Sequence, residues 1–190
     1  MKKLIFLFLL CLAFQSHALE LAGVKVDDTV QIETHQLVLN GAGVRSKFVV
    51  KVYVIALYLS EKAHTAEAVL VGNGAKRISL QMVRDVSGKL FFDGLNASIL
   101  ANHSAAEMVA LEPKVDRLLK FISTIPELKK GETINLDYLP GLGTKIIING
   151  VDKGVIEGID FNRALLKIWL GQKPVNKALK QVLLDDEEEK

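Results

Sequence analysis

The sequence predicts a single α+β domain in which helices cover one face of a mainly antiparallel β-sheet. Residues 48–59 are apolar and β-branched almost throughout, which is typical of a strand buried on both faces. Shorter strand-like segments occur in both halves of the chain. Segments after Ser87 and from Phe161 place apolar residues at every third or fourth position, which is typical of amphipathic helices. Because strands alternate with helices and no repeat occurs, we expect one domain over residues 19–184.

The segment before this domain, residues 1–18, is typical of a signal peptide. Lys2 and Lys3 precede an apolar run, residues 4–14, that is shorter than the roughly 20 residues of a membrane-spanning helix. Small residues before position 19 suit a signal peptidase, so we expect cleavage after Ala18 and a periplasmic or secreted protein. Cys11 is the single cysteine and leaves with this segment, so the mature chain has no disulfide. No later apolar run is long enough for an integral membrane segment.

The charge of the expected mature chain is balanced. Loss of Lys2 and Lys3 leaves 22 of the 24 basic residues, which equals the 22 acidic residues. No basic stripe of the kind that binds nucleic acid is present, so no nucleic-acid partner is expected. Residues 185–190 are predicted to be a solvated acidic tail. The histidines are scattered without metal-ligand spacing, and neither a metal nor another cofactor is expected.

Strands dominate the first third of the domain. Short strands are predicted at residues 29–33 and 36–39, before the long strand 48–59. Gly41-Ala42-Gly43 lacks the third glycine and the following helix of a dinucleotide-binding fingerprint, so we interpret it as a turn. Side chains alternate along the long strand, and one face carries Val49, Lys51, Tyr53, Ile55 and Leu57.

The middle of the chain turns from strand to helix. Residues 65–71 are predicted to be a short helix capped by Thr65, and residues 77–82 alternate as a strand. A longer amphipathic helix begins near Ser87. Pro113 is expected in the first turn of the next helix, where proline is tolerated. The apolar stripes of these two helices are formed by Leu90, Phe91, Leu95, Ile99 and Leu100, and by Val115, Leu118, Leu119 and Ile122.

The last third returns to strands and ends in helices. Strands are predicted at residues 133–139 and 144–148, and Asn149-Gly150 is a strong turn signal before residues 154–156. A helix that carries Trp169 on its apolar stripe is predicted to end at Gly171. We expect Trp169 to pack in the core. Leu179, Val182 and Leu183 indicate a final short amphipathic helix.

Arg45 is the candidate functional residue that stands out. It follows the glycine-rich segment and precedes the apolar strand, so a cation lies beside a hydrophobic wall. Such an arrangement suits an anion with a hydrophobic tail, and a lipophilic carboxylate would fit. The alternative is a structural role, in which Arg45 pairs with a surface carboxylate for at most about 1 kcal/mol.

Longer motifs of the chain carry a resemblance to a known family. The stretch LNGAGVRSKFVVKVYVIALYLSEK, the stretch KRISLQMVRDVSGKL and the stretch DYLPGLGTKIIINGVDKGVIEGIDFNRALLKIWLGQKP occur in the order typical of chalcone isomerase-like proteins. The resemblance covers most of residues 20–184 and is strongest to the bacterial, exported branch of this superfamily. It implies an open-faced β-sandwich, in which a large antiparallel sheet is covered by a helix layer with a ligand cleft between them.

The resemblance also implies a set of site residues. Arg45 falls on the arginine that binds the negative charge of the substrate in the plant isomerases. Tyr53, Phe91 and Ser98 fall on the threonine, tyrosine and asparagine positions of those enzymes. Phe91 cannot donate a hydrogen bond to a developing enolate, and such a contact is typically worth several kcal/mol of barrier. No catalytic residue is therefore assigned, and the four residues are predicted to bind ligand.

The function that we favour is non-catalytic binding of a small lipophilic anionic ligand, such as a fatty acid, as some members of the superfamily do. Arg45 and Tyr53 would hold the carboxylate. Eight residues of straight strand span roughly 26 Å, so the two side chains can share a headgroup only if the chain turns near Ser46-Lys47 and pairs back. The alternatives are an intramolecular lyase or isomerase on an unknown substrate, and a structural or partner-binding envelope protein.

Overall fold

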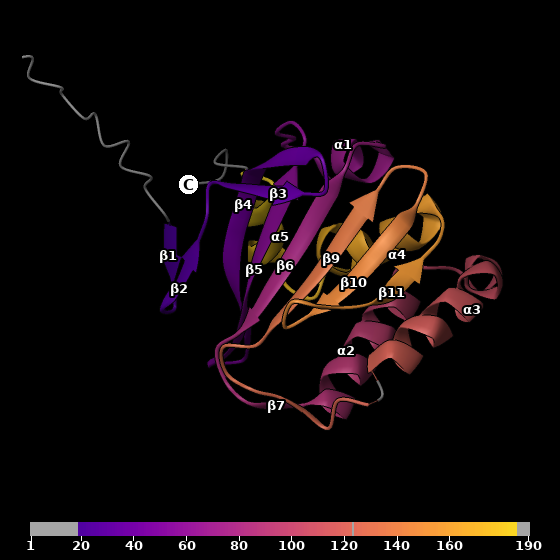
Figure 1. Cartoon of the computed structure of the whole chain (residues 1–190). Coiled ribbons are helices and arrows are strands. Elements are labelled where there is room, and N and C mark those ends of the chain that lie inside the picture. The colour runs from indigo at the N-terminus through magenta and orange to yellow at the C-terminus, as the bar shows by residue number, and fades with distance from the viewer. Residues whose placement is uncertain (1–18, 123, 186–190) are drawn as a thin grey trace, which may run out of the picture.

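A large antiparallel sheet forms the centre of the computed structural model (Figure 1), which describes residues 19–122 and 124–185. The predicted signal peptide and residues 186–190 of the predicted tail lie outside the described residues. The sheet has seven strands in the order β11-β10-β9-β6-β5-β4-β3, and every neighbouring pair is antiparallel. These strands are β3 Thr29–Ile32, β4 His35–Lys47, β5 Val50–Leu59, β6 Lys76–Met82, β9 Thr133–Leu139, β10 Gly143–Ile148 and β11 Val151–Ile156.

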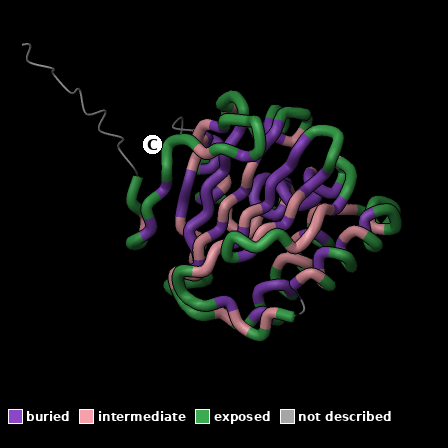
Figure 2. Tube along the Cα trace, in the orientation of Figure 1, coloured by how far each residue is buried: buried purple, intermediate pink, exposed green. Residues whose placement is uncertain are grey.

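A layer of helices covers one face of this sheet, as the sequence predicted. The layer consists of α2 Gly88–Ala101, α3 Ala105–Ile122, α4 Ile159–Leu170 and α5 Lys177–Leu183, with the short α1 Ala66–Val71 beside α4. Buried residues follow the central strands and the inner sides of the helices (Figure 2). No helix in the described part of the chain is both long and apolar enough to cross a membrane. The α+β prediction, with helices on one face of an antiparallel sheet, is confirmed.

The central strand β5 is buried on both faces, as its composition predicted. Its residues Tyr53, Ile55 and Leu57 pack beneath the helix layer. Val54 and Ala56 belong to a second apolar cluster on the opposite face. There the small hairpin of β1 Leu19–Leu21 and β2 Val24–Val26 covers part of the sheet, and the rest of that face stays open.

The predicted turn at Gly41-Ala42-Gly43 and the predicted start of the long strand are both wrong. β4 continues through these glycines to Lys47, and the chain reverses in the next two residues, Phe48 and Val49. The physical reason is close packing, since α5 crosses β4 at this point. A Cβ atom on Gly41 would overlap the backbone oxygen of Val182, so glycine here serves helix approach and not a turn.

The expected position of Pro113 is also wrong, because it lies inside α3 and not in its first turn. The helix begins at Ala105, eight residues earlier. There the Ser104 backbone N–H donates to Glu107 over 2.7 Å, and the Glu107 N–H donates back to the Ser104 hydroxyl. This capping box stabilises the early start. Pro113 has no N–H to donate to the carbonyl of Val109, four residues earlier. Val109 is exposed, so the helix tolerates this lost hydrogen bond.

Several other local predictions are confirmed. The Thr65 hydroxyl caps α1 by accepting from the Ala68 N–H. Asn149 and Gly150 form the turn between β10 and β11 with φ angles of 52° and 77°, in the left-handed region that these residue types tolerate. The strand predicted at residues 154–156 is also present. It is β11, which begins three residues before the predicted start.

Candidate functional site

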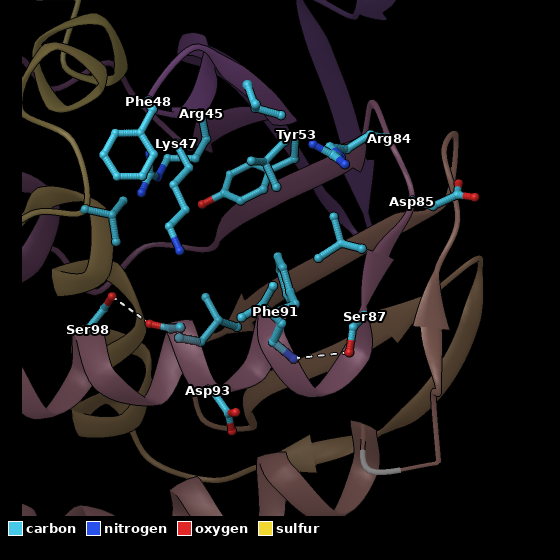
Figure 3. A pocket seen from close by; sticks show the side chains of 17 residues that line it. Arg45, Lys47, Phe48, Tyr53, Arg84, Asp85, Ser87, Phe91, Asp93 and Ser98 are labelled. Atoms are coloured by element: carbon cyan, nitrogen blue, oxygen red, sulfur yellow. Dashed lines mark hydrogen bonds between the residues drawn. The ribbon is translucent and has the colours of Figure 1, made fainter.

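A cavity of about 600 Å³ opens between the β4–β5 hairpin and α2 (Figure 3). Its wall is mainly apolar, and charged side chains also line it. All four predicted ligand-binding residues line this one cavity, namely Arg45, Tyr53, Phe91 and Ser98. The remaining lining residues are Lys47, Phe48, Val50, Val52, Arg84, Asp85, Val86, Ser87, Leu90, Asp93, Gly94, Leu95 and Val175.

The hairpin places Arg45 directly opposite Tyr53. The two residues are register partners of β4 and β5, although eight positions separate them in the sequence. Paired residues on neighbouring strands have Cβ atoms about 5 Å apart and project to the same face. The required reversal of the chain therefore exists, at Phe48 and Val49 and not at Ser46-Lys47. The register shifts immediately after Arg45, where Val52 of β5 is left without a partner on β4, and irregularities of this kind are frequent near functional sites.

The Tyr53 hydroxyl forms a hydrogen bond with a buried tryptophan. The Trp169 indole N–H donates to the Tyr53 hydroxyl oxygen over 3.0 Å, and both side chains are buried. Sequence reasoning assigned Trp169 to the core, which is where it lies, but it missed this contact with the site. The apolar stripe of α4 contains no signal for it, since the partner lies 116 residues away.

The hydroxyl of Tyr53 is a hydrogen-bond donor that keeps its proton. Burial raises its pKa to about 12, although the bond from Trp169 and the positive charge of Arg45 both act to lower it. An indole N–H can only donate, so the Tyr53 oxygen is the acceptor in that bond. Its own O–H proton therefore remains available to a ligand in the cavity.

Helix α2 supplies Phe91 and Ser98 from the opposite wall. The Ser87 side chain caps this helix, and one turn later Phe91 meets the Tyr53 ring edge-on, with 5.9 Å between the ring centroids. The Ser98 hydroxyl donates to the Gly94 carbonyl over 2.8 Å, as Figure 3 shows. Its proton is thus engaged within the helix, and only its lone pairs face a ligand. Phe91 contributes shape and apolar surface, and Ser98 a weak acceptor.

Arg45 is half-buried and forms no ion pair within residues 19–122 and 124–185. The two acids that line the cavity have cations of their own, since Asp85 lies 3.7 Å from Lys129 and Asp93 lies 2.5 Å from Lys89. The structural alternative, in which Arg45 pairs with a carboxylate, is therefore not what the described residues show. A half-buried guanidinium beside an apolar cavity suits an incoming anion. In the same part of the chain, no group of three metal-ligating side chains stands together.

Comparisons with known proteins agree with this architecture. A family model described as chalcone isomerase-like matches residues 18–185. A solved fatty-acid binding protein of Arabidopsis thaliana superposes with a TM-score of 0.68 and 15% sequence identity, over 86% of this chain and 93% of that one. At this identity the likeness shows a shared fold. A search of curated proteins found no match. Because the family model covers nearly all of the domain, this protein belongs to the chalcone isomerase-like family.

Proposed function

We propose that the protein binds a lipophilic carboxylate, such as a fatty acid, in the cavity between the β4–β5 hairpin and α2. Arg45 holds the carboxylate and the Tyr53 hydroxyl donates a second hydrogen bond to it. The observation that carries this proposal is their direct pairing across the two strands at the wall of one cavity. Charge-assisted bonds from a guanidinium are about twice as strong as neutral ones, so this pair is a suitable anchor.

The rest of the cavity suits a hydrocarbon tail. Its volume of about 600 Å³ lies within the roughly 300–1,000 Å³ of ordinary small-molecule sites. Most of the exposed wall is apolar, and Val52, Val86 and Leu95 contribute to it. The fatty-acid binding function of the superposed Arabidopsis protein supports the same ligand class, through the fold that the two share.

The proposed role is binding without catalysis. Chemistry of the isomerase type needs donors that stabilise a developing enolate, and Phe91 offers only a ring where such a donor would stand. We further propose that residues 1–18 direct export and that the carrier acts outside the cytoplasm. N-terminal sequencing of the protein purified from its host cells should then begin at Leu19, and a start at Met1 would contradict export.

The ligand itself can be tested by extraction. Purified wild-type protein is denatured in organic solvent, and the released molecules are identified by mass spectrometry. We expect stoichiometric amounts of fatty acids or related carboxylates, and a loss of about tenfold or more in Arg45→Gln, since a charge-assisted bond contributes roughly 1.5–3 kcal/mol.

Arg117→Gln is the matched control for this extraction. Arg117 is an exposed arginine of α3 that lies near the Phe121 ring, outside the cavity. Its variant should release as much lipid as the wild type. An empty wild-type protein, or an equal lipid content in Arg45→Gln and wild type, would contradict the proposal.

A further inference from the structure

The tip of the β4–β5 hairpin is exposed and hydrophobic. Phe48 is 92% exposed and Val49 is 95% exposed, the two highest values among the exposed large hydrophobic residues of the described chain. Hairpin turns normally use Gly, Asn or Asp, and the β10–β11 hairpin of this same protein has Asn149-Gly150. The composition of the tip therefore departs from what a solvated turn requires.

The backbone at the tip departs from the common pattern as well. Phe48 has a φ angle of 54°, in the left-handed region where a bulky side chain is uncommon. Residues held in this region against their preference are found where function requires them. The strained position thus holds an aromatic ring out in solvent, where the ring adds nothing to the core.

Cations surround this hydrophobic tip. Lys47 and Lys51 flank it on the two strands, and Arg84 lies exposed nearby at the edge of the cavity. Within the described residues none of the three takes part in an ion pair. An aromatic and an aliphatic side chain among free cations is the composition of protein segments that lie in the interface of an anionic bilayer.

The tip is also the edge of the ligand cavity. Lys47, Phe48 and Val50 line the cavity, and Leu90 of α2, itself 61% exposed, lines it from the facing wall. Figure 3 shows Phe48 and Lys47 beside Arg45 at one end of the cavity. A surface that receives the tip therefore also meets the cavity opening and its arginine.

We propose that the hairpin tip, residues 47–51, docks on an anionic phospholipid bilayer, with Phe48 and Val49 inserted among the lipids and Lys47, Lys51 and Arg84 on the headgroups. A second copy of this chain is a poorer occupant, because its own tip brings the same cations into contact. The purpose of this docking rests on the proposed function, since it sets the cavity opening where lipophilic carboxylates partition. The docking itself is measured without any ligand.

Flotation with vesicles tests the docking. Vesicles of about three parts phosphatidylcholine to one part phosphatidylglycerol should carry the wild-type protein upward at low salt. Neutral phosphatidylcholine vesicles, or a high salt concentration, should carry several-fold less, since headgroup attraction is screened. Val49→Asp should bind the anionic vesicles about tenfold more weakly, because burial of one valine contributes roughly this factor or more.

Two variants complete the design. Val49 does not line the cavity, so Val49→Asp should keep the wild-type affinity for dodecanoate in vesicle-free solution. Val151→Asp is the matched control, since Val151 is a 55% exposed valine at the other end of the sheet, in the β10–β11 hairpin. It should float as the wild type does. Lys51→Glu should weaken flotation and leave dodecanoate affinity unchanged.

The outcomes separate the docking from the proposed function. Wild-type protein that does not float, equal flotation of wild type and Val49→Asp, or equal flotation on neutral and anionic vesicles would overturn the docking. Flotation with the expected variant pattern in a protein that binds no dodecanoate would leave the docking standing and overturn the carboxylate-binding function.

Discussion

Trp169 donates its indole N–H to the hydroxyl oxygen of Tyr53 across 3.0 Å, beneath the floor of the ligand cavity. This bond joins α4 of the helix layer to β5 of the sheet. It makes the Tyr53 oxygen the acceptor, so that the phenol keeps its own proton and can act as a donor toward a ligand in the cavity. One buried contact thus connects core packing to ligand recognition.

Tyr53→Phe should destabilise the protein through this contact. The variant leaves the buried Trp169 N–H without its acceptor, which typically costs about 1–3 kcal/mol. Urea unfolding measures the cost. Trp169 is the sole tryptophan of the chain, so a change in its fluorescence reports the altered surroundings directly. The double variant Tyr53→Phe, Trp169→Phe should recover part of the loss. Equal stability of Tyr53→Phe and wild type would show that the bond contributes nothing.

Tyr53 should also govern stability in alkaline solution. Its pKa is raised from 10.0 to about 12 by burial, so the unfolded state ionises first. The stabilising contribution is complete below pH 10 and is lost as the pH rises to 12, by on the order of 2 kcal/mol. Tyr53→Phe should therefore lose less stability than the wild type between pH 10 and pH 12.

The contributions of the other titrating groups to the pH dependence of stability cancel when Tyr53→Phe is compared with the wild type. Burial lowers the pKa of Lys76 to about 8, so stability should rise between pH 8 and pH 10.5 in both proteins. Burial raises the pKa of Tyr58 to about 12 in both as well. Urea unfolding at each pH gives the difference that belongs to Tyr53. Parallel curves for the two proteins up to pH 12 would contradict the assignment.

The same substitution at two glycines should have opposite effects. Gly41→Ala should destabilise by more than about 2 kcal/mol, because its Cβ overlaps backbone atoms of α5 that cannot move independently. Gly94→Ala in α2 should stabilise by roughly 0.5–1 kcal/mol, because its Cβ meets nothing within 4 Å and alanine favours a helix. Thermal unfolding measures both. A Gly41→Ala protein as stable as the wild type would exclude the close approach of α5 to β4.

An ion pair on the open face of the sheet should contribute more to stability than an ion pair exposed on a helix. Arg77 and Asp137 form a two-bond ion pair there, at 2.6 and 2.5 Å, with the carboxylate side chain 4% exposed. Asp137→Ala leaves a largely buried guanidinium unpaired and should cost about 3 kcal/mol. Asp93→Ala, which breaks the exposed Lys89–Asp93 pair, should change stability by less than about 0.5 kcal/mol. Similar losses from the two variants would contradict this difference.

Much of the fold was predictable because buried residues recur in the sequence at the spacing of a strand or a helix. Ile55 and Leu57 alternate with Val54 and Ala56, and both sets are buried on opposite faces of β5. The Asn149-Gly150 turn was predictable from residue type alone. Pro113 was misplaced because the capping box at Ser104 and Glu107 decides where α3 begins, and a proline inside the helix is tolerated there.

The candidate site was predictable only in part. The choice of Arg45 came from its place before an apolar run, and the structure puts all four selected residues on one cavity. The reversal at Phe48 and Val49 was missed because its residues are those of a strand and not of a turn. A local rule broken in this way is expected where a segment serves function. Trp169 was missed as part of the site because its contact with Tyr53 depends on how α4 crosses the sheet.

The central claim is that Arg45 holds the carboxylate of a lipophilic ligand. The most direct test is calorimetry with dodecanoate and dodecanol, each titrated into wild type and Arg45→Gln. We predict that the wild type binds the acid at least about tenfold more tightly than the alcohol, since a charge-assisted bond contributes roughly 1.5–3 kcal/mol, and that Arg45→Gln binds both alike. An unchanged preference for the acid in Arg45→Gln would contradict the claim.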